Sequence, residues 1–312
     1  MEYETIHFAF DISMTPHEFS LIYHELRFKA ELPKRAGQSF QDFFEQIMQK
    51  VDPYFQMIKP MGKAGDWKAD GYSPATGTVY QCYAPEKLTV AKGAKKINED
   101  LTGAQKRWKR KMRRWVFVWS SVDGLPAEVA ALLAELRAKH RKLAQEDMGP
   151  EGLWKLVGKL SLHDRISLFG AVPEISSATE TTAVEIQMLL NHLSASPLVS
   201  LEENDLALTA IADKLQRNRL SIALTAMLKP AIPVAKLVGK FVTGMPDPNF
   251  SRIIAARLAE KYNELTASVS DPDAIFAGLV DYLLAGPLNG RLYWAAMGIV
   301  AYYFELCDIF ER

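Results

Sequence analysis

The spacing of apolar residues predicts two helices near the start of the chain. Apolar side chains recur every three or four positions over residues 16–30, just after a capping box formed by Thr15 and Glu18. A second stripe with the same period runs over residues 40–50. Its apolar members are Phe40, Phe43, Phe44, Ile47 and Met48. Both segments therefore predict amphipathic helices that bury one face.

Short apolar runs further along the chain predict strands. We expect a strand over residues 54–59, a second at Tyr72, a hairpin turn over 73–77 and a strand over 78–84. The run at 115–120 is almost wholly apolar, which is typical of a strand buried on both faces.

Residues 94–114, between the last two strands, predict a basic helix. Five apolar residues are spaced to pack inward: Ile97, Leu101, Ala104, Trp108 and Met112. The predicted order in the first half is therefore helix, strand, strand, strand, basic helix and strand.

The second half of the chain has a different pattern. Residues 126–146 predict one long helix, and the Gly-Pro-Glu-Gly string at 149–152 marks a boundary. Beyond it the apolar residues follow helical periods with almost no strand signal. We expect an α+β protein, with an α/β domain at 1–148 and an all-α domain at 149–312. The last helix, at 292–310, is apolar on most sides, so it is either central to the domain core or covered by a partner. Because it is so rich in aromatic residues, we expect it to self-associate or to dock on partner subunits.

Composition narrows the class of protein. The chain has 312 residues, 48% of them apolar and 24% charged, which fits two globular domains. Cys82 and Cys307 match no metal or disulfide spacing, which favours a reducing, cytoplasmic setting. The start lacks a signal-peptide pattern, and we expect no apolar stretch near the roughly 20 residues of a membrane span.

The net charge of zero is a cancellation between regions. Eleven basic and two acidic residues lie between Lys87 and Arg114, so this segment carries nine positive charges and the rest of the chain nine negative ones. A basic block attracts polyanions, with contacts that weaken in salt. We expect nucleic acid there, helped by Trp108 and Trp115; the alternative is a solvated helix face beside an acidic partner surface. The candidate contact residues are Lys68, Lys106, Lys109, Arg110 and Arg113.

A glycine-bounded turn at 65–71 carries the candidate chemistry. It contains Asp66 and Asp70, and the strand that follows carries Gln81. Oxygen ligands of this kind suit Mg²⁺, which can activate a water for attack on a phosphodiester. The alternative is structural, because Asp and Gly fill turns in most proteins.

The element order and this turn resemble the PD-(D/E)XK nuclease fold. Residues 40–83 are similar to restriction-endonuclease-like domains, especially the branch with an Asp-Gly turn followed by a Gln-x-Lys strand. The resemblance implies an αβββαβ core with Mg²⁺ (or Mn²⁺) as cofactor. It also implies that Glu45 is the acid of the first core helix, that Asp70 and Gln81 are metal ligands, and that Asp66 is an auxiliary acid.

The chain departs from the family pattern at one position. Tyr83 stands where the family has a lysine that orients and activates the attacking water, and its pKa near 10 makes it a weak substitute. Our candidate replacement is Lys95 in the basic helix, with Lys63, Lys68, Lys87 and Lys96 as alternatives. If no other lysine takes this role, the domain binds DNA and does not cut it.

Two further strings resemble a defence family. Residues 79–86 (VYQCYAPE) and 301–311 (AYYFELCDIFE) look like parts of effectors in ABC-three-component systems of the Lamassu type. The resemblance implies a nuclease acting on double-stranded DNA in a complex with an SMC-like ATPase and a small accessory subunit. The aromatic-rich last helix adds the expectation of a homo-oligomer formed through the C-terminal helices. The chain has no phosphate-binding loop, so an ATPase would be a separate chain. The alternative function is a catalytically inactive DNA-binding scaffold of such a complex.

Overall fold

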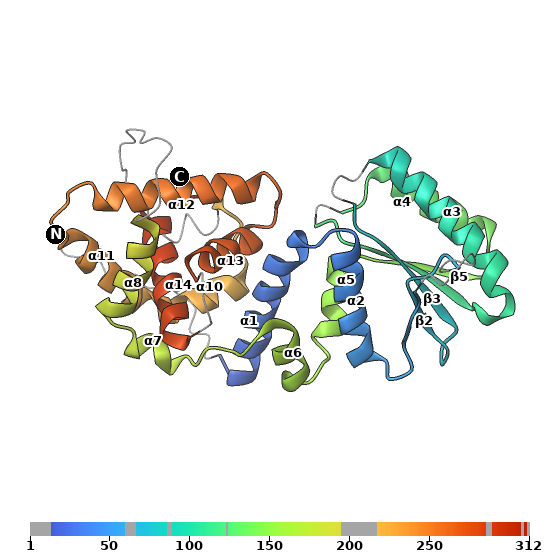
Figure 1. Ribbon diagram of the computed structural model, residues 1–312, viewed down its shortest axis with the longest axis horizontal. Coiled ribbons are helices and arrows are strands. Elements are labelled where there is room, and N and C mark those ends of the chain that lie inside the picture. The colour runs from blue at the N-terminus through green and yellow to red at the C-terminus, as the bar shows by residue number, and fades with distance from the viewer. Residues whose placement is uncertain are drawn as a thin grey trace. The chain divides into compact units, whose positions relative to one another are not determined.

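The computed structural model describes residues 14–59, 67–85, 89–122, 124–194, 217–284, 289–306 and 309–310. The chain divides into two compact units (Figure 1). The first, here called the sheet unit, is Glu31–Leu168. The second, the helical unit, joins Met1–Ala30 to Phe169–Arg312. This division differs from the boundary predicted at 148, because the first helix packs with the C-terminal helices and residues 149–168 pack with the sheet.

The sheet unit contains five strands and flanking helices. Its elements are η1 (Leu32–Lys34), α2 (Gln38–Val51), β1 (Gln56–Met57), β2 (Gly71–Ser73), β3 (Thr78–Tyr83), α3 (Val90–Trp108), η3 (Lys109–Lys111), β4 (Arg114–Trp119), α4 (Ala127–Lys139), β5 (Ala144–Met148), α5 (Pro150–Val157) and α6 (Leu162–Phe169).

The strands form one mixed sheet in the order β1-β2-β3-β4-β5. The first three are antiparallel neighbours, whereas β3, β4 and β5 run parallel, with Gln81 beside Phe117 and Tyr83 beside Trp119. Helices α3 and α4 cover one face, and α2 and α5 cover the other (Figure 1). The mixed sheet confirms the α+β class and the predicted order of elements from α2 to β4.

The face beneath α3 and α4 is the main apolar core of this unit. It joins Val79 on β3 and Phe117 on β4 to the inward stripe of α3. All five residues predicted to line that stripe are buried. The 3.6-residue period of the sequence therefore identified the buried face of α3 correctly.

Strand β5 was not predicted, and its residues explain why. The helix expected over 126–146 ends at Lys139, and Ala144–Met148 pairs with β4 at the edge of the sheet. Its sequence, AQEDM, has one large apolar residue, because an edge strand buries little of its surface. The alternation that usually reveals a strand is therefore missing.

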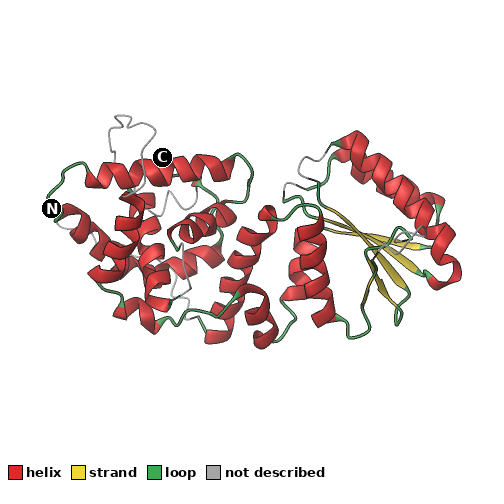
Figure 2. Ribbon diagram, in the orientation of Figure 1, coloured by secondary structure: helices red, strands yellow, loops and turns green. Residues whose placement is uncertain are grey.

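The helical unit contains no strand among its described residues (Figure 2). Its elements are α1 (Pro16–Glu31), α7 (Ser176–Glu180), α8 (Ala183–Ser194), α10 (Ile222–Leu228), η4 (Lys229–Ala231), α11 (Ile232–Thr243), α12 (Phe250–Thr266), α13 (Pro272–Leu283) and α14 (Gly290–Glu305). Helix α14 lies among the others and packs against α11, α8, α13 and α7. The all-α region after the sheet is thus confirmed, with α1 added to it.

Four of the five aromatic rings of α14 are buried inside the helical unit itself, and Tyr302 is half-buried against the same core. Trp294 and Tyr303 have no exposed surface, and Tyr293 and Phe304 are at most 4% exposed. They lie in one core with α1, α8, α11 and α13. Four to five neighbouring helices can hide more rings than one helix face can, which the sequence estimate did not allow for.

One described segment, Ile222–Thr243, is long and apolar enough to cross a membrane on length and composition, contrary to the sequence expectation. Half of it is buried within the structure. It is also interrupted by the 3₁₀ turn η4, and Val234 and Val238 of α11 belong to the core around α14. These contacts explain its apolar character as that of core helices.

Candidate metal site and nucleic-acid surface

Asp70 stands directly before β2, and its carboxylate reaches across to β3. The backbone fixes this position: the Asp70 N–H donates to the Tyr80 carbonyl oxygen at 2.9 Å, and the Ile58 N–H donates to the Asp70 carbonyl oxygen at 3.2 Å. Its Oδ2 accepts hydrogen bonds from Nε2 of Gln81 at 2.5 Å and from the backbone N–H of Cys82 at 2.6 Å. The structure therefore brings Asp70 and Gln81 together.

The Gln81 side chain is buried and only half satisfied. Its Oε1 has no hydrogen-bond partner in the described part of the chain. A buried carbonyl oxygen left unmatched costs about 1–3 kcal/mol. Turning the amide by half a rotation would place Oε1 beside the Asp70 carboxylate, an arrangement that a cation between the two oxygens would stabilise.

Asp70 and Gln81 can supply the protein's share of an Mg²⁺ site. No group of three or more His, Cys, Asp and Glu side chains gathers as a metal site among the residues the structure describes. Mg²⁺ typically binds through one or two carboxylates and keeps several waters, so one carboxylate and one amide oxygen form an acceptable protein share of its ligands.

Glu45 lies on the other side of the sheet from the Gln81 side chain. Helix α2 packs on the face of β3 that carries Tyr80, with the Phe44 and Tyr80 ring centroids 5.4 Å apart, and successive strand side chains alternate between faces. The Glu45 carboxylate accepts a hydrogen bond from Gln49 at 3.0 Å, and its Oε2 lies 3.8 Å from Nζ of Lys59. The structure thus gives Glu45 partners on its own side; Asp66 lies outside the described residues.

Tyr83 and Lys95 are both poorly placed to replace the family lysine. The Tyr83 ring lies 5.8 Å from that of Phe117, and burial raises the pKa of Tyr83, so it stays protonated near neutral pH. Lys95 is on the solvent side of α3, with its side chain 76% exposed and its Nζ 3.9 Å from a carboxylate oxygen of Glu99. Sequence position alone did not reveal either environment.

A buried carboxylate that the sequence analysis overlooked lies on the inward face of α3. Asp100 is fully buried, and its two oxygens lie 2.7 Å from Nζ of Lys96 and 3.3 Å from Nζ of Lys68. The Lys68 side chain crosses α3 at Gly103, where an added Cβ would come within 2.6 Å of it. Lys68, predicted to bind nucleic acid, is therefore also a counter-ion of Asp100. An acid inside the apolar stripe of α3 was the signal in the sequence.

The charge of Lys96 acts on Cys82, the residue that follows Gln81 and whose backbone N–H binds Asp70. The pKa of the Cys82 thiol is raised well above its usual value by burial and by the Asp70 carboxylate, while the charge of Lys96 opposes the shift. Both charged groups therefore act on the residue next to Gln81. Lys96, which also pairs with Asp100, is therefore the lysine of α3 whose charge acts on this region, whereas Lys95 faces solvent beside Glu99.

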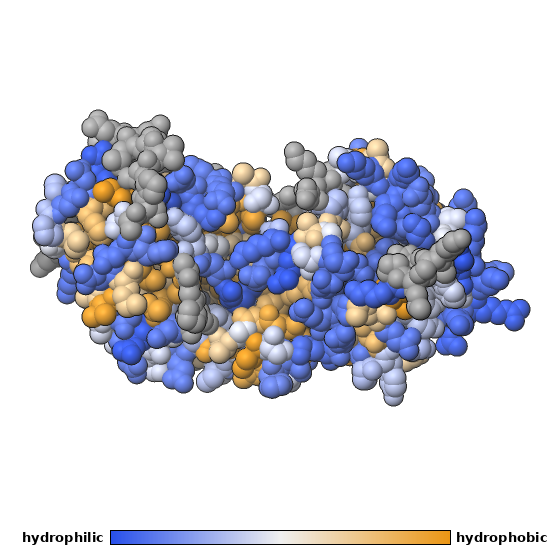
Figure 3. Space-filling view, viewed as in Figure 1, coloured by the Kyte–Doolittle hydropathy of each residue, from blue (hydrophilic) through white to orange (hydrophobic). Residues whose placement is uncertain are grey.

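Exposed basic residues collect where α3 ends and β4 begins. We call them the basic end: Lys106, Arg107, Lys109, Arg110, Lys111 and Arg113. All six are exposed, and none forms an ion pair with another described residue. The surface of the sheet unit along α3 is correspondingly hydrophilic (Figure 3).

The basic end lies at the start of β3 and the candidate metal site near its end. Arg114 pairs with Thr78, and Gln81 comes three residues later. At about 3.3 Å per residue, the two sites are separated by about 10 Å along the strand.

The aromatic residue exposed beside the basic end is Trp67. Trp108 and Trp115, which were expected to support nucleic-acid contact, are both buried, whereas Trp67 is 39% exposed. The Trp67 and Trp108 ring centroids are 5.8 Å apart, and the Trp108 indole N–H donates to the Trp67 carbonyl oxygen at 3.3 Å. Tyr72 packs on Trp108 at 4.5 Å and donates its hydroxyl to the carbonyl oxygen of Lys111. The sequence places Trp67 in a turn but gives no sign of its exposure.

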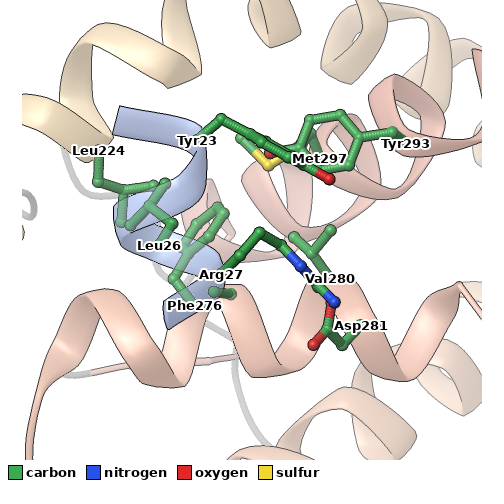
Figure 4. Close-up of a pocket in the computed structure, with 10 residues that line it drawn as sticks. Tyr23, Leu26, Arg27, Leu224, Phe276, Val280, Asp281, Tyr293 and Met297 are labelled. Atoms are coloured by element: carbon green, nitrogen blue, oxygen red, sulfur yellow. The ribbon is translucent and has the colours of Figure 1, made fainter. Parts of the chain in front are cut away.

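A small pocket in the helical unit is structural in character (Figure 4). Arg27 of α1 points toward Asp281 of α13 and pairs with it, and the remaining lining is mostly apolar. Desolvation raises the pKa of Tyr23 to about 12 and that of Tyr293 well above its usual value, so both phenols are neutral. Nothing here resembles a nucleophile with its base.

Comparisons with protein-family models, with curated proteins and with solved structures found no match to this chain.

Proposed function

We propose that the sheet unit is a restriction-endonuclease-like domain that hydrolyses phosphodiester bonds of DNA with Mg²⁺ (or Mn²⁺). The observation that carries the proposal is the contact between the Asp70 carboxylate and the Gln81 amide. It occurs within the order α2-β1-β2-β3-α3-β4, which is the order that the PD-(D/E)XK resemblance implies.

In this proposal, different residues bind the metal ion, bind the phosphate backbone and supply a positive charge near the site. Asp70 and Oε1 of Gln81 would hold the ion, which when bound supplies a polarised water and neutralises charge on the phosphate. The basic end holds the phosphate backbone about 10 Å away along β3. We assign the ammonium near the site to Lys96, because it acts on the neighbouring Cys82 and Lys95 does not.

A second candidate function is a DNA-binding scaffold without catalysis. Two observations favour it: Tyr83 is protonated where the family has a lysine, and Glu45 belongs to the helix on the opposite face of the sheet. In that case Asp70 serves to satisfy the Cys82 N–H and the Gln81 amide, and the basic end alone remains functional.

The wider setting rests on the resemblance of the strings at 79–86 and 301–311 alone. On that basis we propose that the chain is the effector of an antiphage complex with an SMC-like ATPase and a small accessory subunit. Self-association through the C-terminal helices remains part of the proposal, with less support from the aromatic content of α14, because four of its five aromatic residues are buried within the unit.

Two variants of the full-length chain separate cleavage from scaffolding. Asp70→Asn should abolish Mg²⁺- or Mn²⁺-dependent cutting of plasmid and linear duplex while leaving duplex binding intact. Gln81→Glu places two carboxylates side by side, which repel each other unless a cation lies between them. Its thermal unfolding midpoint should therefore rise with Mn²⁺ much more than that of Asp70→Asn, because an ion that binds only the folded state stabilises it.

A different pair of results would contradict the nuclease proposal. If the wild type cuts nothing in either metal with its partners present, and Gln81→Glu gains no stability from Mn²⁺, the site holds no metal and the scaffold function stands. Lys95→Met is the matched control for Lys96→Met: only the second should lower the rate of cutting.

A further inference from the structure

Trp67 is an unusual residue to leave exposed on this part of the protein. It is 39% exposed, and among the described residues the one other aromatic side chain exposed to a similar degree or more is Tyr54, at 65%. No ring from the described residues packs against Tyr54, whereas Trp67 is held edge-on by Trp108. An indole that is both rigid and open presents an apolar face without loss of side-chain entropy on binding.

The backbone around this indole is held in a conformation that costs energy. Trp67 and Lys68 both have positive φ, at 57° and 58°, and Lys109 has a φ of 47°. Non-glycine residues in this region cost on the order of 1–3 kcal/mol each and are found mainly at functional sites. All three lie around Trp108, because Lys109 follows it and Trp67 accepts its indole hydrogen bond.

Charge decides what kind of ligand fits beside the indole. Tyr72 lies on Trp108 and donates to Lys111, so Trp67 and the basic end surround the same buried tryptophan. The six cations there lack acidic partners among the described residues. Cations next to an aromatic face are the combination that binds the backbone and the bases of a single strand.

We propose that Trp67 stacks on an unpaired base, and that Trp67 with the basic end forms a contact site for single-stranded nucleic acid. An intact duplex covers the faces of its bases, so an indole on the protein surface can stack only where a base is unpaired. The inference rests on the proposed binding of nucleic acid by the sheet unit, and it adds the strandedness of the ligand. It does not depend on metal or cleavage at Asp70.

The test measures binding of the full-length chain by fluorescence anisotropy, in chelator and without divalent metal. Three labelled probes of equal length are compared: an oligothymidylate, the same backbone with abasic sites, and a blunt duplex. The oligothymidylate should bind more tightly than the abasic strand by about 5- to 150-fold, the range that stacking of one base supplies. An oligouridylate arm shows whether RNA binds equally well.

Variants assign the difference to a residue. Trp67→Ala should remove the preference for bases while leaving affinity for the abasic strand unchanged, and Trp67→Phe should keep most of the preference. Tyr54→Ala is the matched control and should change neither. Reversing Lys109, Arg110 and Arg113 to Glu should weaken binding of every probe and reduce its salt dependence.

Equal binding of the oligothymidylate and the abasic strand by the wild type would overturn the proposal. So would a base preference that survives Trp67→Ala or disappears in Tyr54→Ala. Loss of cutting in Asp70→Asn bears only on the nuclease, because that variant should retain the preference for bases. Tight duplex binding with no base preference would leave the nuclease proposal standing and refute this one.

Discussion

The most prominent side-chain clusters of the sheet unit and of the helical unit differ in their exposure to solvent. In the sheet unit, six cations and one indole are exposed around the end of α3. In the helical unit, four of the five aromatic residues of α14 are buried, and Arg27 of α1 is paired with Asp281. The contrast is between two segments: the end of α3 presents charge to solvent, and α14 uses its aromatic residues to hold helices together.

The difference shows that composition alone does not tell an interface from a core. The basic block and the aromatic run were both expected to form binding surfaces, because each has a high local density of one residue type. The basic block was expected at the surface and is there, because burying unpaired cations is prohibitively costly. The aromatic run was expected at the surface in part and is buried, because burial of rings is favourable wherever neighbouring helices can reach them.

The largest effect should come from opening the core of the helical unit. Trp294 has no exposed surface, stacks near Phe19 of α1, and donates its indole N–H to the Glu174 carbonyl oxygen at 2.8 Å. Trp294→Ala should lower the free energy of unfolding by about 3–5 kcal/mol through the cavity and the lost hydrogen bond. Denaturant unfolding followed by circular dichroism measures it.

The control is an exposed apolar residue of the same unit. Met188 on α8 is 57% exposed, and Met188→Ala should change stability by no more than about 0.5 kcal/mol. If Trp294→Ala proved as mild as Met188→Ala, the aromatics of α14 would not be a core, and the contrast between the units would fail.

A smaller effect is expected where the sheet unit does bury charge. Replacing Lys68 and Lys96 together by Met leaves the Asp100 carboxylate buried without a cation, which should cost about 3 kcal/mol. Adding Asp100→Asn to this variant should restore most of the loss, because no uncompensated charge then remains. Thermal and denaturant unfolding of the three proteins test both steps.

Lys95→Met is the matched control, since its partner Glu99 is half exposed and a solvated pair contributes about 0–1 kcal/mol. A double variant at 68 and 96 as stable as the wild type would show that Asp100 is not held by these lysines.

The sequence predicted those elements of the fold in which the local apolar pattern agrees with burial in the folded protein. The inward stripe of α3 has a helical period, and the contact between Asp70 and Gln81 followed from a turn placed before a strand. Strand β5 was missed because its edge position removes the apolar alternation. The helix α1 was assigned to the wrong unit because nothing local to it says which distant helices it packs against.

The candidate site shows the same limit at the level of single residues. Lys95 and Lys96 are one position apart, which on a helix is a rotation of about 100°, so the first faces solvent beside Glu99 and the second reaches the buried Asp100. Asp100 in the apolar stripe was the available clue, because a buried acid needs a cation and Lys96 is one turn away from it. The exposure of Trp67 depends on the packing of Trp108 and Tyr72 and could not be derived from its neighbours in the chain.

The smallest effect tests a buried group in the helical unit. The Tyr23 hydroxyl is buried and has no hydrogen-bond partner among the described residues. Removing it in Tyr23→Phe should stabilise the protein by about 1 kcal/mol at neutral pH, because an unsatisfied polar group is taken out of the core.

The pH dependence of the same variant provides the sharper measurement. Desolvation raises the pKa of Tyr23 to about 12, whereas the unfolded tyrosine has a pKa near 10. From pH 10 to 12 the unfolded state therefore loses this proton and the folded state keeps it, so wild-type stability falls as pH rises through that window. Tyr23→Phe has no phenol to ionise, so its stability does not fall in this way. Between pH 10 and 12, its free energy of unfolding should therefore gain about 2 kcal/mol relative to that of the wild type. An advantage that stays constant from pH 9 to 12 would show that the Tyr23 phenol is in contact with water in the folded protein.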